Sequence, residues 1–488
     1  MDDLDQLLGG LRLNRRGGAT GRLRMLASIL ATPVALALLC VPASGWAQMV
    51  GPTPTQGNSP SIDRSINPSP GNEGAPEDWA FHGQITLTGQ YHPGFSAAYS
   101  GPQSLDAHEQ ARETFDLTLY GGFRPWEGAE IWVNPEIDQG FGLSGTFGVA
   151  GYVSGEAYKI GASDPYPRLP RVFLRQTIDL GGNREKVEAD LNQLARSQTT
   201  DRLVLTVGRF SVVDTFDTNK YAHDPRNDFL NWSIIDIGSF DYAADAWGFT
   251  YGAAVEWYQD WWTIRSGLFT LSATPNSKAL DTHPFDQYQY VEELEERHEL
   301  FGQQGKLKFL AFLSHGRMGA YDAATALALQ TGTPADIAGV RQAHNKTGVG
   351  FNLEQPVTDD FGVFARGGIT RSQYEEFDFS DINKTFSIGV SVSGQRWGRP
   401  EDTVGLAGAI NNASGAAKRF FAAGGLGGII GDGQLLRSAP ENIIEAYYRI
   451  PVFSFAKLMV DYQFINNPAY NRDRGPVSIF GVRAHAEF

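Results

Sequence analysis

Residues 202–258 read RLVLTVGRFSVVDTFDTNKYAHDPRNDFLNWSIIDIGSFDYAADAWGFTYGAAVEWY. The stretch begins with Leu203–Gly208 and ends with Trp247–Trp257, and both runs alternate apolar with small or polar side chains, as a half-buried strand does. Residues 214–245 between them show no such alternation. A connection of this length is usually functional or disordered. Its many aromatic and branched residues exclude a disordered linker, so we expect it to fold against the rest of the chain.

Period-two alternation recurs from Phe81 to the last residue, Phe488. It predicts an all-β fold of about sixteen strands. The strands near residues 286 and 404 have the weakest patterns, because the first is heavily charged and the second is rich in Gly and Ala. The expected strands begin near residues 80, 111, 128, 169, 202, 246, 261, 286, 305, 346, 361, 383, 404, 440, 455 and 476.

The connections between these strands alternate in length. Those after even-numbered strands are mostly tight turns, and those after odd-numbered strands are mostly long. Short turns at one end and long loops at the other are typical of a transmembrane antiparallel β-barrel, with short periplasmic turns and long extracellular loops. The exception is 181–201, where Arg184 to Arg196 resembles a short helix on the short-turn side. The long connections are 93–110, 139–168, 214–245, 273–285, 317–345 and 413–439.

A secreted β-sandwich or propeller would show the same periodicity, but three features favour a membrane barrel. The polar face of the strands carries full charges, such as Asp116, Arg366 and Arg483, which a dry sandwich core would not solvate. The chain also ends in an aromatic residue on an amphipathic strand. Aromatic residues that we expect in interface girdles cluster at strand ends, namely Trp79, Tyr91, Trp126, Tyr258, Trp261 and Trp262.

The N-terminal residues read as an export signal. A basic segment precedes the apolar run Met25–Leu39, and small residues follow, so we expect a signal peptide over residues 1–47 with cleavage after Ala47. Residues 48–77 are rich in Pro, Ser and Gly and read as a flexible leader, which leaves 78–488 for the barrel. The only cysteine, Cys40, lies in the signal. The formal charge of −15 argues against a nucleic-acid partner.

Two long blocks of the sequence resemble the carbohydrate-selective porin family of the OprB type. They are EIWVNPEIDQGFGLSGTFGVAGYVSGEAYKIG at 130–161 and the stretch 208–258, with further support from LPRVFLRQTIDLGG at 169–182 and ERHEL at 296–300. The resemblance runs from about Asp78 to the end of the chain. It implies an outer-membrane barrel through which sugars diffuse passively, with a constriction made by inward-folded loops.

A sugar-selective pore needs aromatic faces for the sugar ring and fixed hydrogen-bonding groups for its hydroxyls, and its binding must stay weak. Alternation places Trp132, Asn134, Glu136 and Asp138 on the lumen face of one strand, and Arg171 and Arg175 on that of the next. We expect both arginines to extend across the lumen near Glu136 and Asp138. The alternative is a plain barrel wall in which the two arginines pair with acids of the neighbouring strand, Glu130 among them.

Loop 214–245 supplies the remaining candidates, and its apolar residues predict that it folds into the barrel mouth. Its acidic side chains would permit a Ca²⁺ site, but the regular spacing of a calcium loop is missing, as are zinc and hydrolase motifs. We therefore expect no cofactor and no catalytic activity. The candidate sugar contacts in the loop are Asn219, Tyr221, His223, Asp224, Arg226, Asp228 and Trp232.

Taken together, the sequence predicts an outer-membrane porin for small carbohydrates, surrounded by lipid and lipopolysaccharide. The alternatives are a general porin, or a barrel receptor or enzyme that uses its long loops. Planar-bilayer conductance with and without sugar separates these. The sequence leaves open which sugar passes and whether the porin is a monomer or a homotrimer.

Overall fold

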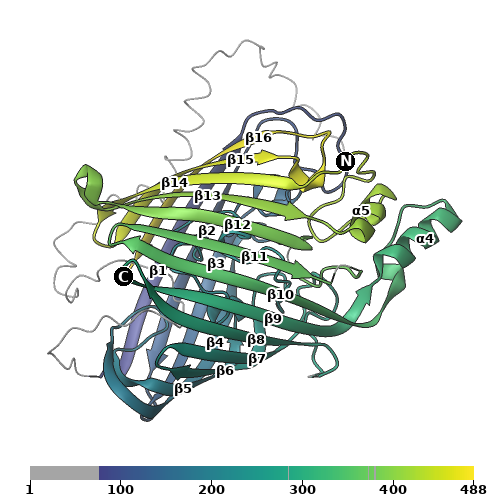
Figure 1. The fold of residues 1–488 in the computed structure, drawn as a ribbon. Coiled ribbons are helices and arrows are strands. Elements are labelled where there is room, and N and C mark those ends of the chain that lie inside the picture. The colour runs from purple at the N-terminus through teal and green to yellow at the C-terminus, as the bar shows by residue number, and fades with distance from the viewer. Residues whose placement is uncertain (1–75, 284, 372, 379–380) are drawn as a thin grey trace, which may run out of the picture. The chain divides into compact units, whose positions relative to one another are not determined.

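Sixteen antiparallel strands form one closed barrel in the computed structural model, which describes residues 76–488 apart from positions 284, 372, 379 and 380 (Figure 1). The expected signal peptide and residues 48–75 of the expected leader lie outside the described residues. The strands are β1 (Trp79–His92), β2 (Gln110–Phe123), β3 (Ala129–Gly140), β4 (Ala162–Val187), β5 (Arg196–Phe210), β6 (Thr250–Gln259), β7 (Trp262–Thr270), β8 (Tyr288–Leu300), β9 (Gln303–Gly319), β10 (Arg341–Thr358), β11 (Phe361–Thr370), β12 (Lys384–Gly394), β13 (Arg399–Asn412), β14 (Glu441–Phe453), β15 (Ala456–Asn466) and β16 (Val477–Glu487).

Each strand pairs with its neighbours in sequence, and the barrel closes where β1 pairs with β16. Gln84 lies opposite Glu487 at this seam. Gly83 and Phe488 then exchange two backbone hydrogen bonds of 2.9 Å. The chain end therefore completes the ring, which removes the unpaired edges that an open sheet would expose. The expected sixteen-stranded barrel is confirmed.

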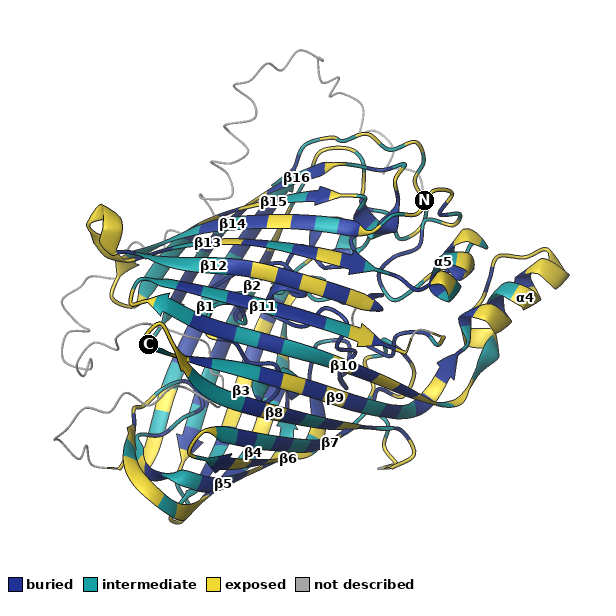
Figure 2. Ribbon diagram, viewed as in Figure 1, coloured by how far each residue is buried: buried dark blue, intermediate teal, exposed yellow. Residues whose placement is uncertain are grey.

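The alternation of side chains separates a lumen face from an outer face. In β3, Trp132 and Asn134 are fully buried, while Val133 and Ile137 are 39% and 38% exposed. The same pattern produces the alternating exposed and buried bands along the strands in Figure 2. Because the exposed positions in the strands are largely apolar, the outer face suits lipid, and the polar residues face inward.

The connections are short at one end of the barrel and long at the other. Those after even-numbered strands span between 2 and 8 residues and define the short-turn end, and those after odd-numbered strands span between 10 and 39 and define the long-loop end. None of the helices in the described part of the chain is long and apolar enough to cross a membrane. The helical elements are η1 (Leu143–Thr146), η2 (Val212–Asp214), α3 (Trp232–Ile235), α4 (Tyr321–Thr331), η3 (Ala338–Val340), η4 (Gln395–Trp397), α5 (Gly415–Ala422) and η5 (Pro468–Tyr470).

The helix expected between Arg184 and Arg196 is wrong. β4 continues to Val187 and pairs with β5, with Arg184 opposite Thr199 and Val187 opposite Arg196. Two register shifts at Gly181 interrupt the alternation there, and this hides the strand from a periodicity argument. β4, β5, β10 and β13 begin five to seven residues earlier than expected, and β6 begins four residues later.

The expected aromatic girdle holds only in part. Trp79, Trp126 and Trp261 are exposed on the outside near the short-turn end. Tyr258 instead faces the lumen, where its hydroxyl donates to Glu256 at 2.7 Å. Its neighbour Trp257 takes the outward position, because two successive residues of a strand point to opposite faces.

Candidate functional site

The connection between β5 and β6, residues 211–249, lies inside the barrel, because lumen-facing side chains bond it from opposite sides of the wall. Asp217 pairs with Arg366 of β11 at 3.0 Å. Arg226 pairs with Asp116 of β2, on the far side of the ring, at 3.1 Å. Further hydrogen bonds join this loop to Gln289 of β8, Lys308 of β9, Lys346 and Asn352 of β10, Glu445 of β14, Gln463 of β15 and Arg483 of β16.

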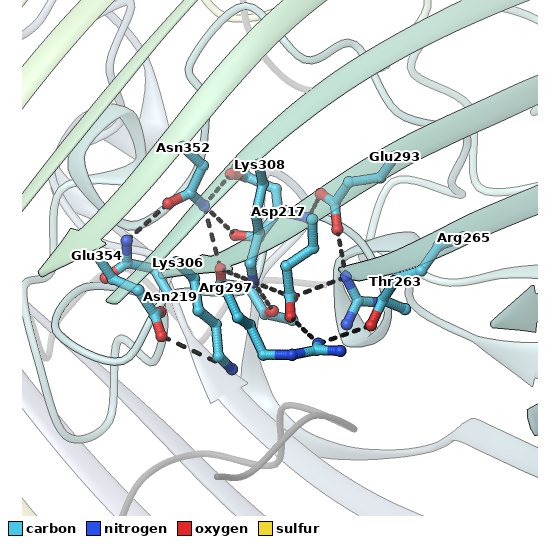
Figure 3. Close-up of polar contacts among 12 residues, drawn as sticks. Asp217, Asn219, Thr263, Arg265, Glu293, Arg297, Lys306, Lys308, Asn352 and Glu354 are labelled. Atoms are coloured by element: carbon cyan, nitrogen blue, oxygen red, sulfur yellow. Dashed lines mark hydrogen bonds and ion pairs between the residues drawn. The ribbon is translucent and has the colours of Figure 1, made fainter. Parts of the chain in front are cut away.

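A dense polar network ties the first part of this loop to strands β7–β10 (Figure 3). Lys308 donates to the carbonyl and the hydroxyl of Thr218, both at 2.6 Å. Asn352 donates to the Asp217 carboxylate at 2.6 Å and accepts from Asn219 at 2.7 Å. The fully buried Arg265 beside them pairs with Glu256, Glu293 and Glu295 at 2.9–3.0 Å. Because these groups are buried and bonded to one another, this side of the lumen is filled.

The connection between β3 and β4, residues 141–161, enters the barrel as well. The Gly151 amide donates to the buried Glu441 carboxylate of β14 at 2.9 Å. The rings of Tyr152 and Trp232 pack with centroids 5.8 Å apart, which joins this loop to the one at 211–249. The two loops therefore form one packed unit within the lumen.

A cavity of about 1040 Å³, including the open space at its mouth, remains between the two loops and the wall strands β1, β2 and β4. One side carries the aromatic cluster of Tyr152, Trp232 and Tyr242, in which Trp232 and Tyr242 lie 5.6 Å apart between ring centroids. Small-molecule sites combine aromatic side chains with a few fixed polar groups, and this lining has both. Further aromatic residues in the lining are Tyr120, Tyr158, Trp247 and Phe249.

Charged residues in the cavity lining form fixed pairs. Arg171 of β4 donates two hydrogen bonds to Asp214, at 2.7 and 2.6 Å. Arg226 lies 3.6 Å from Glu156 of the other loop. Burial raises the pKa of Glu156 well above its ordinary value, against the opposing effect of Arg226. The bidentate pair holds the Arg171 guanidinium in one orientation, which prepares it to meet a polar solute.

His223 also lines the cavity, and its Nδ1 lies 3.3 Å from the Asp236 carboxylate. Burial disfavours the charged imidazole, but Asp236 outweighs that effect and raises the pKa of His223. Across the described residues, no group of three or more His, Cys, Asp or Glu side chains is arranged to hold a metal ion.

The residues predicted to bind sugar fall into three places in the structure. The cavity is lined by Arg171, His223, Asp224, Arg226 and Trp232. The loop residues outside its lining are Asn219, Tyr221 and Asp228, of which Asn219 bonds the β10 wall. The wall residues outside its lining are Trp132, Asn134, Glu136, Asp138 and Arg175, all of which are buried.

The expectation that Arg171 and Arg175 both extend across the lumen beside Glu136 and Asp138 is wrong. Arg175 pairs with Glu130 at 3.3 Å and is buried, and Arg171 pairs with Asp214. Glu136 and Asp138 instead pair with Arg168. The alternative pairing with Glu130 holds for Arg175.

Most of the aromatic lining escaped the sequence argument. Tyr152 and Tyr158 come from loop 141–161, for which only a long connection was predicted. Trp247 and Phe249 were assigned to a strand, but β6 begins after them, at Thr250. The signal that would have found them is the same high aromatic content that led us to fold loop 214–245 inward.

A closed sixteen-stranded barrel, apolar outside and narrowed inside by two folded-in loops, is a porin-type channel. The chain belongs to the carbohydrate-selective porin OprB family, which matches residues 102–488. It is thus a sugar-selective outer-membrane porin, and its outer face contacts membrane lipid.

The chain is similar to two solved structures, and the first of them has the same fold. OprB of Pseudomonas putida in its high-pH structure has a TM-score of 0.63 at 15% identity, over 84% of this chain and 94% of that chain. The outer-membrane channel DcaP of Acinetobacter baumannii has a TM-score of 0.48 at 11% identity, over 84% of this chain and 97% of that chain. No curated protein matches the sequence.

Proposed function

We propose that sugars cross this porin through the cavity between loops 141–161 and 211–249 and bind there weakly on the way. We name residues 211–249 the constriction loop. The observation that carries the proposal is the composition of the lining, in which the aromatic cluster of Tyr152, Trp232 and Tyr242 accompanies the fixed pair of Arg171 and Asp214. Aromatic faces pack against the CH face of a sugar ring, and guanidinium and carboxylate groups replace the water lost from its hydroxyls.

The pairing of charges in the lining favours neutral solutes over ions. Arg171 faces Asp214, Arg226 faces Asp116, and His223 faces Asp236. Because each cation has an acid beside it, a crossing ion meets little net attraction. A neutral sugar still finds donors and acceptors held at fixed positions.

Binding in such a channel has to be weak enough for release. A millimolar site corresponds to about 4 kcal/mol. One or two hydrogen bonds from a charged group, at about 1.5–3 kcal/mol each, then supply a large share of it. The Arg171 guanidinium should therefore matter for sugar binding far more than an arginine outside the cavity.

The test compares Arg171→Ala with Arg175→Ala. The two arginines lie four residues apart on the same face of β4, but only Arg171 lines the cavity. Each truncation leaves its acid with a partner, since Asp214 still accepts from the Ser211 amide at 3.0 Å and Glu130 still pairs with Arg196.

In planar bilayers, Arg171→Ala should raise the sugar concentration for half-block of the current at least about tenfold. Arg175→Ala should leave that concentration near the wild-type value. If the two variants have the same sugar concentration for half-block, the sugar site lies elsewhere. If sugar does not block the current of the wild-type channel, the proposed function itself is refuted.

A further inference from the structure

The hairpin between β4 and β5 extends beyond the barrel wall at the short-turn end. β3 pairs with β4 up to Gln176, and β6 pairs with β5 from Arg202 on. Within the described part of the chain, β4 therefore has β5 as its only partner strand from Asp179 to Val187. Neighbouring strands of a sheet normally fix the direction of a hairpin. Because this part of the hairpin pairs with no neighbouring strand, contacts at its tip determine its direction.

The tip turns back into the lumen. Asp190 and Gln193 exchange two backbone hydrogen bonds of 3.0 Å, which places Leu191 and Asn192 at the turn. Asn192 has the positive φ of 57° that asparagine tolerates well. Leu194 is completely buried and Leu191 is 9% exposed, although the β4 arm of the hairpin is mostly exposed.

Polar groups of the wall hold the tip in this position. Asn134 of β3 donates to the Asn192 side chain at 2.8 Å, and Arg175 of β4 donates to the Asn192 carbonyl at 2.8 Å. Both wall residues are buried and face the lumen. Arg196, at the base of the tip, pairs with Glu130. Asn134 and Arg175 are two of the wall residues that the sequence suggested for sugar, and in the structure both bind the hairpin tip.

A second set of contacts ties the tip to the start of the barrel. The Ala195 amide donates to the Glu77 carboxylate at 2.9 Å, and the Glu77 amide donates to the Ala195 carbonyl at 3.0 Å. Arg124, in the turn after β2, donates to the same Ala195 carbonyl at 3.1 Å. The tip is therefore fastened across the short-turn end of strands β1 to β4.

The register of β3 and β4 places this tip next to the cavity. Asn134, which binds the tip, lies directly opposite Arg171, which lines the cavity. Arg175 lies four residues nearer to the short-turn end than Arg171, about 13 Å along the strand. The network of Figure 3 fills the lumen at β7–β10. A sugar that leaves the cavity along the β1–β4 wall therefore meets the hairpin tip.

We propose that the tip, residues 188–195, is a second constriction in series with the cavity and sets the upper size of sugar that reaches the periplasmic side. The inference rests on the proposed function. The cavity selects sugars by weak binding, and the tip selects them by the width of the opening that it leaves.

The test replaces residues 188–195 by Asn-Gly. Val187 and Arg196 are opposite each other, so a two-residue turn closes the hairpin between them without further change. The matched control is Arg184→Ala, because Arg184 is an exposed residue of the β4 arm that lies outside residues 188–195 and 3.9 Å from Asp179. Single-channel conductance and swelling of proteoliposomes in glucose and in raffinose are measured for both variants and the wild type.

The shortened channel should conduct up to about twice as much as the wild type, because two narrow segments in series add their resistances. Its swelling rate in raffinose relative to glucose should rise, with glucose block of the current unchanged. Unchanged conductance and an unchanged ratio in a folded variant would refute the second constriction. If the shortened chain does not assemble, Asn192→Ala loosens the tip and decides the question by the same two readouts.

The two proposals fail separately. A wild-type current that glucose does not block counts against the proposed function, whatever the hairpin variants do. A wild-type current that glucose blocks, together with a shortened hairpin that changes neither readout, counts against the hairpin alone.

Discussion

The substitution Asp217→Ala should release one side of the constriction loop from the barrel wall. Its carboxylate accepts from Arg366 at 3.0 Å, from Asn352 at 2.6 Å and from the Ile237 amide at 2.5 Å. Both Asp217 and Arg366 are fully buried. Asp217→Ala removes three acceptor contacts at once and leaves the guanidinium of Arg366 without its carboxylate.

The size of the effect follows from these contacts. Breaking a buried ion pair by removal of one partner costs about 3–5 kcal/mol. Arg366 keeps two backbone acceptors, the carbonyls of Asp217 and Ile234 at 3.0 and 2.9 Å, so we take about 3 kcal/mol. Alanine at the positive φ of 57° adds about 1 kcal/mol. A total near 4 kcal/mol shifts the balance between the docked and released segment about a thousandfold.

The assay is single-channel recording, with Asp217→Asn as the matched control. Asparagine keeps hydrogen-bonding capacity and tolerates positive φ, but it lacks the charge. Asp217→Ala should show higher and noisier conductance, since the lumen at β9–β11 opens, and Asp217→Asn should lie between it and the wild type. Wild-type conductance and noise in a folded Asp217→Ala channel would refute the anchoring role that Figure 3 indicates.

Two further predictions concern pH and closure of the barrel. Burial raises the pKa of the Asp228 carboxyl to about 6 from its ordinary 3.8. The folded protein therefore holds a proton on Asp228 more tightly than the unfolded chain does, and the free energy of unfolding falls as the pH rises from about 4 to about 6. The thermal unfolding temperature should therefore increase between pH 7 and pH 5, and Asp228→Asn should reduce that increase; an equal increase in both would contradict the assignment. Deletion of residues 482–488 removes the pairing of Phe488 with Gly83 and should leave protease-sensitive material that does not insert into the membrane, whereas normal insertion would contradict closure through β16.

The barrel was predictable because it depends on local rules. A residue in a strand points to the opposite face from its neighbour, so Trp132 and Val133 were assigned to lumen and lipid without knowledge of their contacts. The lengths of the connections then distinguished the short-turn end of the barrel from the long-loop end. The prediction failed where glycines broke the alternation, as at Gly181, and where aromatic residues such as Phe249 continued a strand pattern past the strand.

The sequence alone therefore determined the barrel, its number of strands and the apolar character of the constriction loop. Only the tertiary structure decided which polar groups meet in the lumen. Arg171 and Arg175 have the same residue type, strand and face, yet one lines the cavity with Asp214 and the other holds the hairpin tip at Asn192. The physical reason is that a lumen-facing charge takes its partner from segments that the barrel brings within about 3 Å. The sequence distance between such partners is 17 residues for Asn192 and Arg175, 149 for Asp217 and Arg366, and 255 for Asp228 and Arg483.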